Sequence, residues 1–219
     1  MNSAAIAAQL AARGHAADEA GVHEAEITAR VRLDTDLAAP RTSTESAAIH
    51  ARYLRYVLEH LGITAEAEVE AMAAWRRDYN PPVGLWDRAD PEAAEALGRV
   101  KRAGIVAGVI SNSNGSVSSI LEATGLARHL DFVIDSSVVG VEKPDRRIFE
   151  LALARARVAA GEAVYVGDLY SVDVLGARAA GIDAVLLDPL GLWAPRDCRL
   201  ARGLTAAVAL LLGEVTPEG

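Results

Sequence analysis

Residues 163–181 read AVYVGDLYSVDVLGARAAG, and this stretch contains the clearest structural signal in the chain. Its first four residues, 163–166, form a short apolar run that is typical of a buried strand. Gly167 and Asp168 end that run, residues 172–180 have a helical pattern, and Gly181 is a helix stop signal. The stretch therefore predicts a strand, then a turn that carries an acidic side chain, then a helix.

The same alternation of strand and helix continues on both sides of this stretch. We predict further strands over residues 105–110, 132–134 and 184–187. Helices are predicted from Asp90-Pro91-Glu92, from Gly115 and from Asp145, because aspartate caps helix starts and proline is tolerated in the first turn. Strands that alternate with helices of this length form parallel sheets covered on both faces. The fold class predicted is α/β, with a doubly wound parallel sheet.

Residues 1–80 show helical periodicity and no strand signal. The predicted helices start near the N-terminus, at Asp18, at Thr42 and at Thr64, and Thr42 with Glu45 matches a capping box. We therefore predict two domains. Residues 1–80 form a small helical cap with a linker to the core, and residues 81–219 form the α/β core.

Composition limits the classes of function. The chain has 219 residues, 51% hydrophobic and 24% charged, with a formal net charge of −8. This charge argues against nucleic acid and anionic membrane surfaces as partners, since both require clustered basic residues. A single cysteine, Cys198, excludes an internal disulfide. With no signal-peptide pattern and no apolar run long enough to cross a bilayer, we predict a cytoplasmic protein whose oligomeric state the sequence does not indicate.

Ligands of parallel α/β sheets bind beyond the carboxyl ends of the strands, so the residues that follow each apolar run are the candidates for a site. Asp168 and Asp173 lie five positions apart across the turn after one strand, which suits a hard cation with oxygen ligands. The alternative is that Asp168 is a turn residue and Asp173 a helix cap.

Two further residues have a pattern that suits a phosphoryl group. Lys143 precedes Pro144, which restricts the backbone before it, and a fixed ammonium can neutralise a transferring phosphoryl group. Ser111 follows the strand over residues 105–110 and can offer its hydroxyl and nearby amides to an anionic oxygen. A surface lysine and a helix-capping serine are the alternatives.

In this order, Ser111-Asn112, Lys143-Pro144 and the stretch from Gly167 to Asp173 resemble the second, third and fourth motifs of the haloacid dehalogenase (HAD) superfamily. The helical residues before them resemble the cap that this superfamily inserts between its first and second motifs. The resemblance implies a magnesium-dependent phosphatase that acts on a small phosphorylated metabolite through an aspartyl-phosphate. It implies that Ser111 and Asn112 bind the phosphoryl group, that Lys143 stabilises its charge, that Asp168 ligates Mg²⁺, and that Asp173 ligates it or orients the other ligands.

The first motif of the superfamily, an apolar strand that ends in the nucleophilic aspartate, is not recognisable in this sequence. Residues 33–37, Leu-Asp-Thr-Asp-Leu, have two aspartates at the right spacing, but Arg30 and Arg32 occupy positions that a buried strand keeps apolar. We therefore expect a truncated chain, without its first core strand and catalytically incomplete. An in-frame reading of the DNA upstream of Met1 tests this expectation, and an immediate stop codon there contradicts it.

Two alternative functions stay open. A 2-haloacid dehalogenase differs from a phosphatase at a residue in the unrecognised segment, so the sequence does not separate them, although the acidic pair favours the phosphatase. A non-catalytic relic that binds a partner or a phosphorylated ligand is the other alternative. Joint retention of the Ser, Lys and Asp residues argues against it. The identity of the substrate is not readable from the predicted cap.

Overall fold

A computed structural model describes residues 1–39, 42–79 and 84–214. They form two compact units, Met1–Ala89 and Asp90–Gly219. The boundary that we predicted, between residues 80 and 81, lies outside the described residues.

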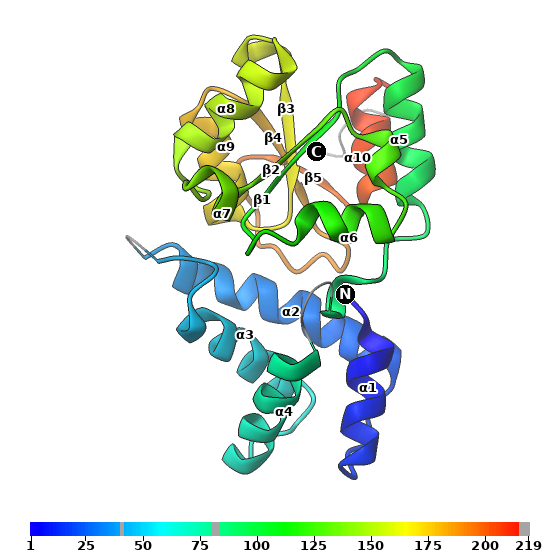
Figure 1. The fold of residues 1–219 in the computed structure, drawn as a ribbon, viewed down its shortest axis with the longest axis vertical. Helices are drawn as coiled ribbons and strands as arrows, with labels where there is room; N and C mark the ends of the chain where they lie inside the picture. Colours follow the sequence, from blue (N-terminus) through cyan, green and yellow to red (C-terminus); the bar gives the residue numbers. More distant parts are fainter. Residues whose placement is uncertain (40–41, 80–83, 215–219) are drawn as a thin grey trace. The chain divides into compact units, whose positions relative to one another are not determined.

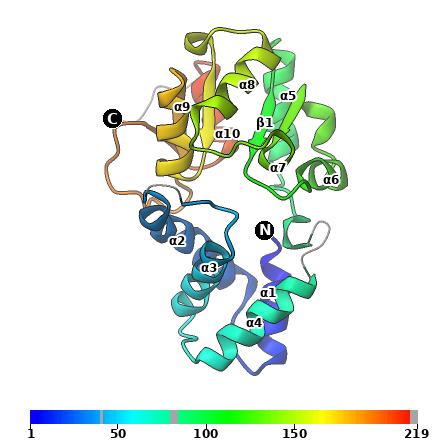
Figure 2. The same cartoon turned by 60° about the vertical axis from the view of Figure 1, so that its left-hand side comes forward.

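The described residues of the first unit are helical, without a strand, as the sequence predicts (Figure 1). Helices α2 and α3 lie side by side (Figure 2). Buried Leu10, Val22, Leu58 and Met72 form the centre of the main apolar core. The elements are α1 (Ser3–Ala12), α2 (Glu19–Leu37), α3 (Ala47–His60), α4 (Glu66–Tyr79) and the 3₁₀ turn η1 (Gly84–Trp86).

The start of α3 differs from the prediction. The helix begins at Ala47, and its cap is Ser46, which accepts a hydrogen bond from the Ile49 amide at 3.3 Å. Thr42 does not cap α3, because it lies five residues before the start of the helix, and the Glu45 amide donates to the Ser43 hydroxyl instead, at 3.1 Å. The predicted capping box is therefore wrong.

Residues 33–37 lie in α2. Asp36 in this segment accepts hydrogen bonds from Arg52 and from the Tyr56 hydroxyl, both on α3. A helical segment tied to a neighbouring helix is not the end of a core strand. This agrees with our rejection of residues 33–37 as the first motif.

The second unit alternates strands and helices. It contains α5 (Ala93–Arg102), β1 (Gly108–Ser111), α6 (Val117–Ala123), η2 (Ala127–His129), β2 (Phe132–Asp135), α7 (Ser136–Val139), α8 (Arg146–Ala156), η3 (Ala160–Glu162), β3 (Val164–Gly167), η4 (Tyr170–Val174), α9 (Leu175–Ala179), β4 (Asp183–Leu187), β5 (Arg199–Ala201) and α10 (Leu204–Leu211). In Figure 1, α8 and α9 lie on one side of the strands and α5 and α10 on the other. The most deeply buried side chains of this unit include Ile134, Ile148, Phe149 and Leu186.

Three local predictions need correction. Strand β1 begins at Gly108 rather than at residue 105, and Ile105 and Val106 are about half exposed. The predicted helix over residues 172–180 begins instead as a π-helical turn over Tyr170–Val174, and the α-helix covers only Leu175–Ala179. Strand β5 and helix α10 were not predicted.

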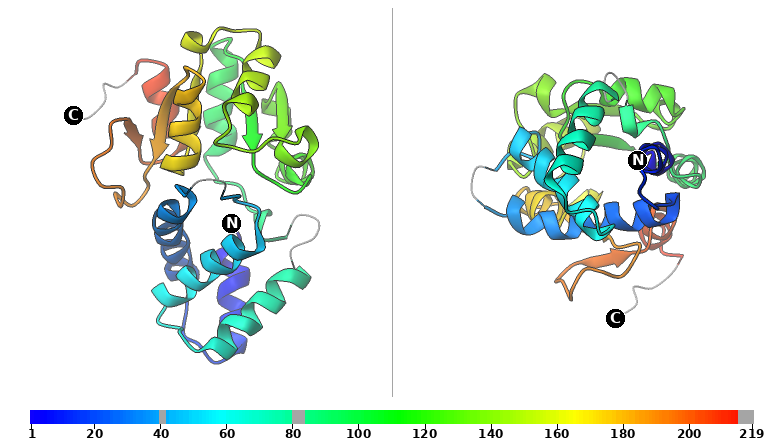
Figure 3. Two further views of the ribbon diagram at one scale, coloured as in Figure 1. Left: turned by 90° about the vertical axis from the view of Figure 1, so that its left-hand side faces the viewer. Right: turned by 90° about the horizontal axis from the view of Figure 1, so that it is seen from below.

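Every strand pair is parallel, which confirms the parallel α/β prediction, but the strands form two groups. β1 pairs with β2 in the register Gly108↔Phe132 to Ser111↔Asp135, whereas β4 pairs with β3 on one side and β5 on the other. Within the described residues, no strand pairing joins β1 to β3. The left panel of Figure 3 shows the green strands β1 and β2 apart from the yellow-to-orange strands β3 to β5.

Candidate active site

The carboxyl ends of the strands carry the polar side chains that the sequence singled out. Two of these side chains shape loops. Buried Asp135, at the end of β2, accepts hydrogen bonds from the amides of Gly115, Val117 and Ser137. Buried Asp188, after β4, accepts them from the amides of Leu192 and Trp193. Both carboxylates are thus used to hold the backbone that surrounds this edge.

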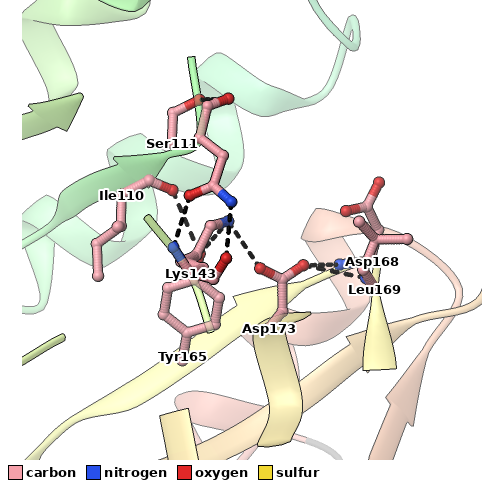
Figure 4. Close-up of polar contacts among 8 residues, drawn as sticks. Ile110, Ser111, Lys143, Tyr165, Asp168, Leu169 and Asp173 are labelled. Carbon is pink, nitrogen blue, oxygen red and sulfur yellow. Dashed lines mark hydrogen bonds and ion pairs between the residues drawn. The ribbon is translucent and has the colours of Figure 1, made fainter. Parts of the chain in front are cut away.

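The centre of the candidate site is an ion pair between Lys143 and Asp173 (Figure 4). The Lys143 Nζ lies 2.7 Å from Asp173 Oδ1, and the two side chains are only 12% and 3% exposed. Burial by itself would lower the pKa of the ammonium, but the Asp173 carboxylate and the Tyr165 phenol raise this pKa above its usual value. Lys143 is therefore a fixed positive charge.

The backbone of Lys143 is attached to the residue that follows β1. The Asn112 side chain donates to the Lys143 carbonyl at 2.9 Å and accepts from the Lys143 amide at 2.8 Å. The Ser111 hydroxyl points to the Asn112 carbonyl at 3.4 Å. Asn112 thus ties the backbone of Lys143 to the segment that follows β1.

The Gly167-Asp168 turn is held by Asp173. Asp173 Oδ2 accepts hydrogen bonds of 3.0 Å from the amides of both Asp168 and Leu169. A Cβ at Gly167 would lie 2.5 Å from the Asp173 carboxyl group, so only glycine allows this approach. Gly176 has a similar role, because its Cβ would meet the Phe149 ring at 2.7 Å and Pro144 Cα at 3.0 Å.

Tyr165 belongs to this site, although our sequence analysis assigned it only to a strand. Its hydroxyl accepts a hydrogen bond from Lys143 Nζ at 3.0 Å and donates one to the Ile110 carbonyl at 3.3 Å. The ring packs edge-on against Phe149. One signal was present in the sequence, since a tyrosine in a buried strand needs a partner for its hydroxyl.

The predicted metal ligands, Asp168 and Asp173, lie at this edge, but their carboxylates do not converge. Asp173 faces Lys143 and the two turn amides, and Figure 4 shows the Asp168 carboxylate pointing away from it. Among the described residues, no group of three His, Cys, Asp or Glu side chains could hold a metal ion. The acidic pair can supply part of a cation site, and a complete one needs further oxygen ligands.

Comparison with known proteins shows the family of the chain. The family model "haloacid dehalogenase-like hydrolase" matches residues 3–181. The chain belongs to this family of hydrolases. This result confirms the superfamily that the three motifs indicated, and the HAD-like α/β fold with them.

Among curated relatives of this hydrolase, a ribulose-1,5-bisphosphate 5-phosphatase from Halopiger xanaduensis is 34% identical over 68% of this chain and 63% of its own length. A phosphoserine phosphatase from Thermus thermophilus is 40% identical over 63% of this chain and 53% of its own length. A crystal structure of 2-haloacid dehalogenase from Pseudomonas syringae matches with a TM-score of 0.56 and 26% identity, over 98% of this chain and 89% of the other. The chain thus spans roughly half to two thirds of the length of these curated relatives.

These comparisons support the hydrolase family and the phosphatase character of its relatives. The individual roles of Ser111, Asn112, Lys143, Asp168 and Asp173 stay predictions. No helix in the described part of this family member is long and apolar enough to cross a membrane.

Proposed function

We propose that this HAD-like hydrolase is a magnesium-dependent phosphatase of small phosphate esters that reacts through an aspartyl-phosphate. The observation that carries the proposal is the buried ion pair of Lys143 with Asp173, which links the turn after β3 to the Ser111-Asn112 segment after β1. Curated relatives include phosphatases that act on phosphoserine and ribulose bisphosphate, in support of the substrate class.

Lys143 and Ser111 bind the phosphoryl group in this proposal. An ammonium has three N–H donors, and the described residues engage two of them, through Asp173 and Tyr165. The third is available for a phosphoryl oxygen. The Ser111 hydroxyl turns from its 3.4 Å contact with Asn112 to a second phosphoryl oxygen, since that contact is long for an O–H donor.

Asp168 provides an oxygen ligand for Mg²⁺, and Asp173 orients the ligand shell. This division follows from the contacts of Asp173, whose oxygens already accept from Lys143 and from the amides of Asp168 and Leu169. Bound magnesium would supply positive charge to the phosphoryl oxygens. Carboxylate, phosphate and water oxygens are the ligands that this cation prefers, and the Asp168 carboxylate supplies one such oxygen at the carboxyl edge of the sheet.

We place the nucleophile on a strand between β1 and β3, a strand that is not found among the described residues. The facing edges of β1 and β3 lack a partner strand among the described residues, which supports this position. The nucleophilic carboxylate attacks phosphorus, the ester P–O bond breaks, and the alcohol leaves with a proton from a general acid. Water then cleaves the acyl phosphate and releases inorganic phosphate. Without this carboxylate we expect essentially no turnover, because loss of a nucleophile costs on the order of a millionfold in rate.

Phosphate binding by residues 1–219 tests the anion site apart from turnover. Calorimetric titration with inorganic phosphate in Mg²⁺ should show binding that Lys143→Ala abolishes. Lys101→Ala is the matched control, since Lys101 is the only other lysine in the chain and donates to the Arg128 carbonyl away from the site. Binding that survives Lys143→Ala would contradict the role of Lys143.

Turnover tests the reaction itself. Residues 1–219 should not hydrolyse para-nitrophenyl phosphate in Mg²⁺, whereas a longer chain that supplies the strand and its aspartate should do so. Turnover by residues 1–219 that Asp168→Ala abolishes would overturn the proposed incompleteness.

A 2-haloacid dehalogenase is the second candidate, because the Pseudomonas syringae dehalogenase structure matches almost the whole chain. Chloride release from 2-chloropropionate by the longer chain, without phosphate ester hydrolysis, would favour it. If the longer chain turns over neither substrate yet still binds phosphate, the non-catalytic alternative is favoured.

A further inference from the structure

A second cationic group lies close to the turn that carries Asp168, and the proposed reaction does not use it. The guanidinium of Arg196 lies 4.6 Å from the centre of the Tyr170 ring and 5.4 Å from that of the Trp193 ring. Stacking on aromatic faces restrains an arginine while its in-plane N–H groups stay directed outward. Those N–H groups match a carboxylate or a phosphate.

The loop that carries Arg196 is held in place by the sheet. Trp193 is only 7% exposed, and its amide donates to the buried Asp188 carboxylate that follows β4. Tyr170 begins the turn η4. Arg196 thus packs against two aromatic rings that are each anchored to the carboxyl edge of the sheet.

The nearest carboxylate on the loop, Asp197, is used by other groups. It accepts a hydrogen bond of 2.7 Å from the Tyr170 hydroxyl and forms an ion pair of 2.8 Å with Arg178. These two partners lower the pKa of Asp197, which therefore stays ionised. Within the described residues, no ion pair joins Arg196 to a carboxylate, so its charge is left for a ligand.

Arg196 stacks on Tyr170, which is close in sequence to the proposed magnesium ligand Asp168. Tyr170 follows Asp168 by two residues, so their Cα atoms are at most ~7 Å apart. The Arg196 guanidinium thus stacks on a side chain that starts two residues after the proposed magnesium ligand.

We propose that Arg196 binds a second anionic group, a carboxylate or a further phosphate, on the phosphate ester substrate. This inference rests on the proposed function and narrows its substrate class. The chain has a net charge of −8, so a positive group at this edge selects anions against the overall field. Arginine suits the role because its planar fork pairs with both oxygens of such a group.

The test compares two pairs of probes by calorimetric titration of residues 1–219 in Mg²⁺. 3-Phosphoglycerate and glycerol 3-phosphate differ by one carboxylate, whereas fructose 1,6-bisphosphate and fructose 6-phosphate differ by one phosphate. We expect at least tenfold tighter binding of the doubly anionic member in at least one pair. The pair that shows the preference tells which anion is recognised.

Arg196→Gln should abolish that preference and change the affinity for the singly phosphorylated probe less than twofold. Arg196→Lys, which keeps the charge but loses the planar fork, should retain only part of it. Arg202→Gln is the matched control, because it removes one exposed positive charge just after β5, at the same sheet edge, and should leave the preference intact.

The outcomes separate the two proposals. If glycerol 3-phosphate binds but no doubly anionic probe binds more tightly, or if the preference survives Arg196→Gln, Arg196 is not the recognition residue and the proposed function still stands. If no probe binds, the proposed function fails and this inference fails with it.

Discussion

The hydroxyl of Tyr165 on β3 donates a hydrogen bond of 3.3 Å to the carbonyl of Ile110 on β1, although β1 and β3 do not pair with each other. The same hydroxyl accepts from Lys143 at 3.0 Å. One side chain thus connects the two groups of strands and the ammonium of the candidate site.

Tyr165→Phe removes both hydrogen bonds while the ring stays packed on Phe149. We expect a loss of about 1–3 kcal/mol in the free energy of unfolding, because the buried Ile110 carbonyl and one Lys143 N–H lose their partner. Urea denaturation followed by circular dichroism measures it. Tyr79→Phe, at an exposed tyrosine, should change stability by less than about 0.5 kcal/mol. Equal effects at both positions would show that the Tyr165 hydroxyl makes no special contribution.

Gly167→Ala tests the close approach of Asp173 to the turn after β3. The new Cβ would lie 2.5 Å from the Asp173 carboxyl group, so either the turn or Asp173 must move. Overpacking of this kind costs about 1–3 kcal/mol. Gly161→Ala is the control, since nothing lies within 4 Å of its Cβ. Thermal unfolding of the two variants should therefore differ by several degrees, and identical melting temperatures would contradict the packing argument.

The sequence predicted the fold of the second unit well where a local signal was strong. Gly167-Asp168 marked the end of β3, and Asp145 capped α8 as expected, with its side chain accepting from the Arg147 amide. The prediction from sequence failed where the bounds of an element depend on tertiary contacts. Ile105 and Val106 are as apolar as Val109 and Ile110, but only residues from Gly108 onward have a partner on β2.

The candidate site shows the same limit. Spacing and resemblance brought Ser111, Lys143 and Asp173 together, and the structure places them in one connected network. Tyr165 was not predicted as a site residue, because its partners Lys143 and Ile110 are 22 and 55 residues away in sequence. Local pattern does not report contacts over such distances.

The pH dependence of the stability of the first unit should reflect the ionisation of the Glu68 carboxylate, which pairs with Arg13 and His15. Hydrogen bonds from these two side chains lower its pKa from 4.5 to about 2. A group whose pKa is lower in the folded protein stabilises the fold above its unfolded pKa, and this contribution is lost as the pH falls through the folded pKa. The stability difference between the native chain and Glu68→Gln should thus be present at about pH 5 and shrink toward pH 2. A difference that stays the same at pH 7 and pH 3 would contradict this, and Glu70→Gln, at an exposed residue of the same helix, is the control.

The Lys143–Asp173 pair should behave as a coupled unit in a double-mutant cycle. Asp173→Asn leaves an ammonium buried beside a neutral amide, and Lys143→Met leaves a carboxylate with only the amides of Asp168 and Leu169. Removal of one partner from a buried ion pair costs about 3–5 kcal/mol, mainly because the other charge stays desolvated. The double variant has no uncompensated charge, so its loss should be at least about 2 kcal/mol smaller than the sum of the single losses. The exposed pair Arg146–Glu150 is the control. A cycle with Arg146→Met and Glu150→Gln should give a coupling energy of about 0.5 kcal/mol or less. Additive losses at Lys143 and Asp173 would mean that water screens the pair, and Asp173 would then not hold the Lys143 ammonium in place for phosphoryl binding.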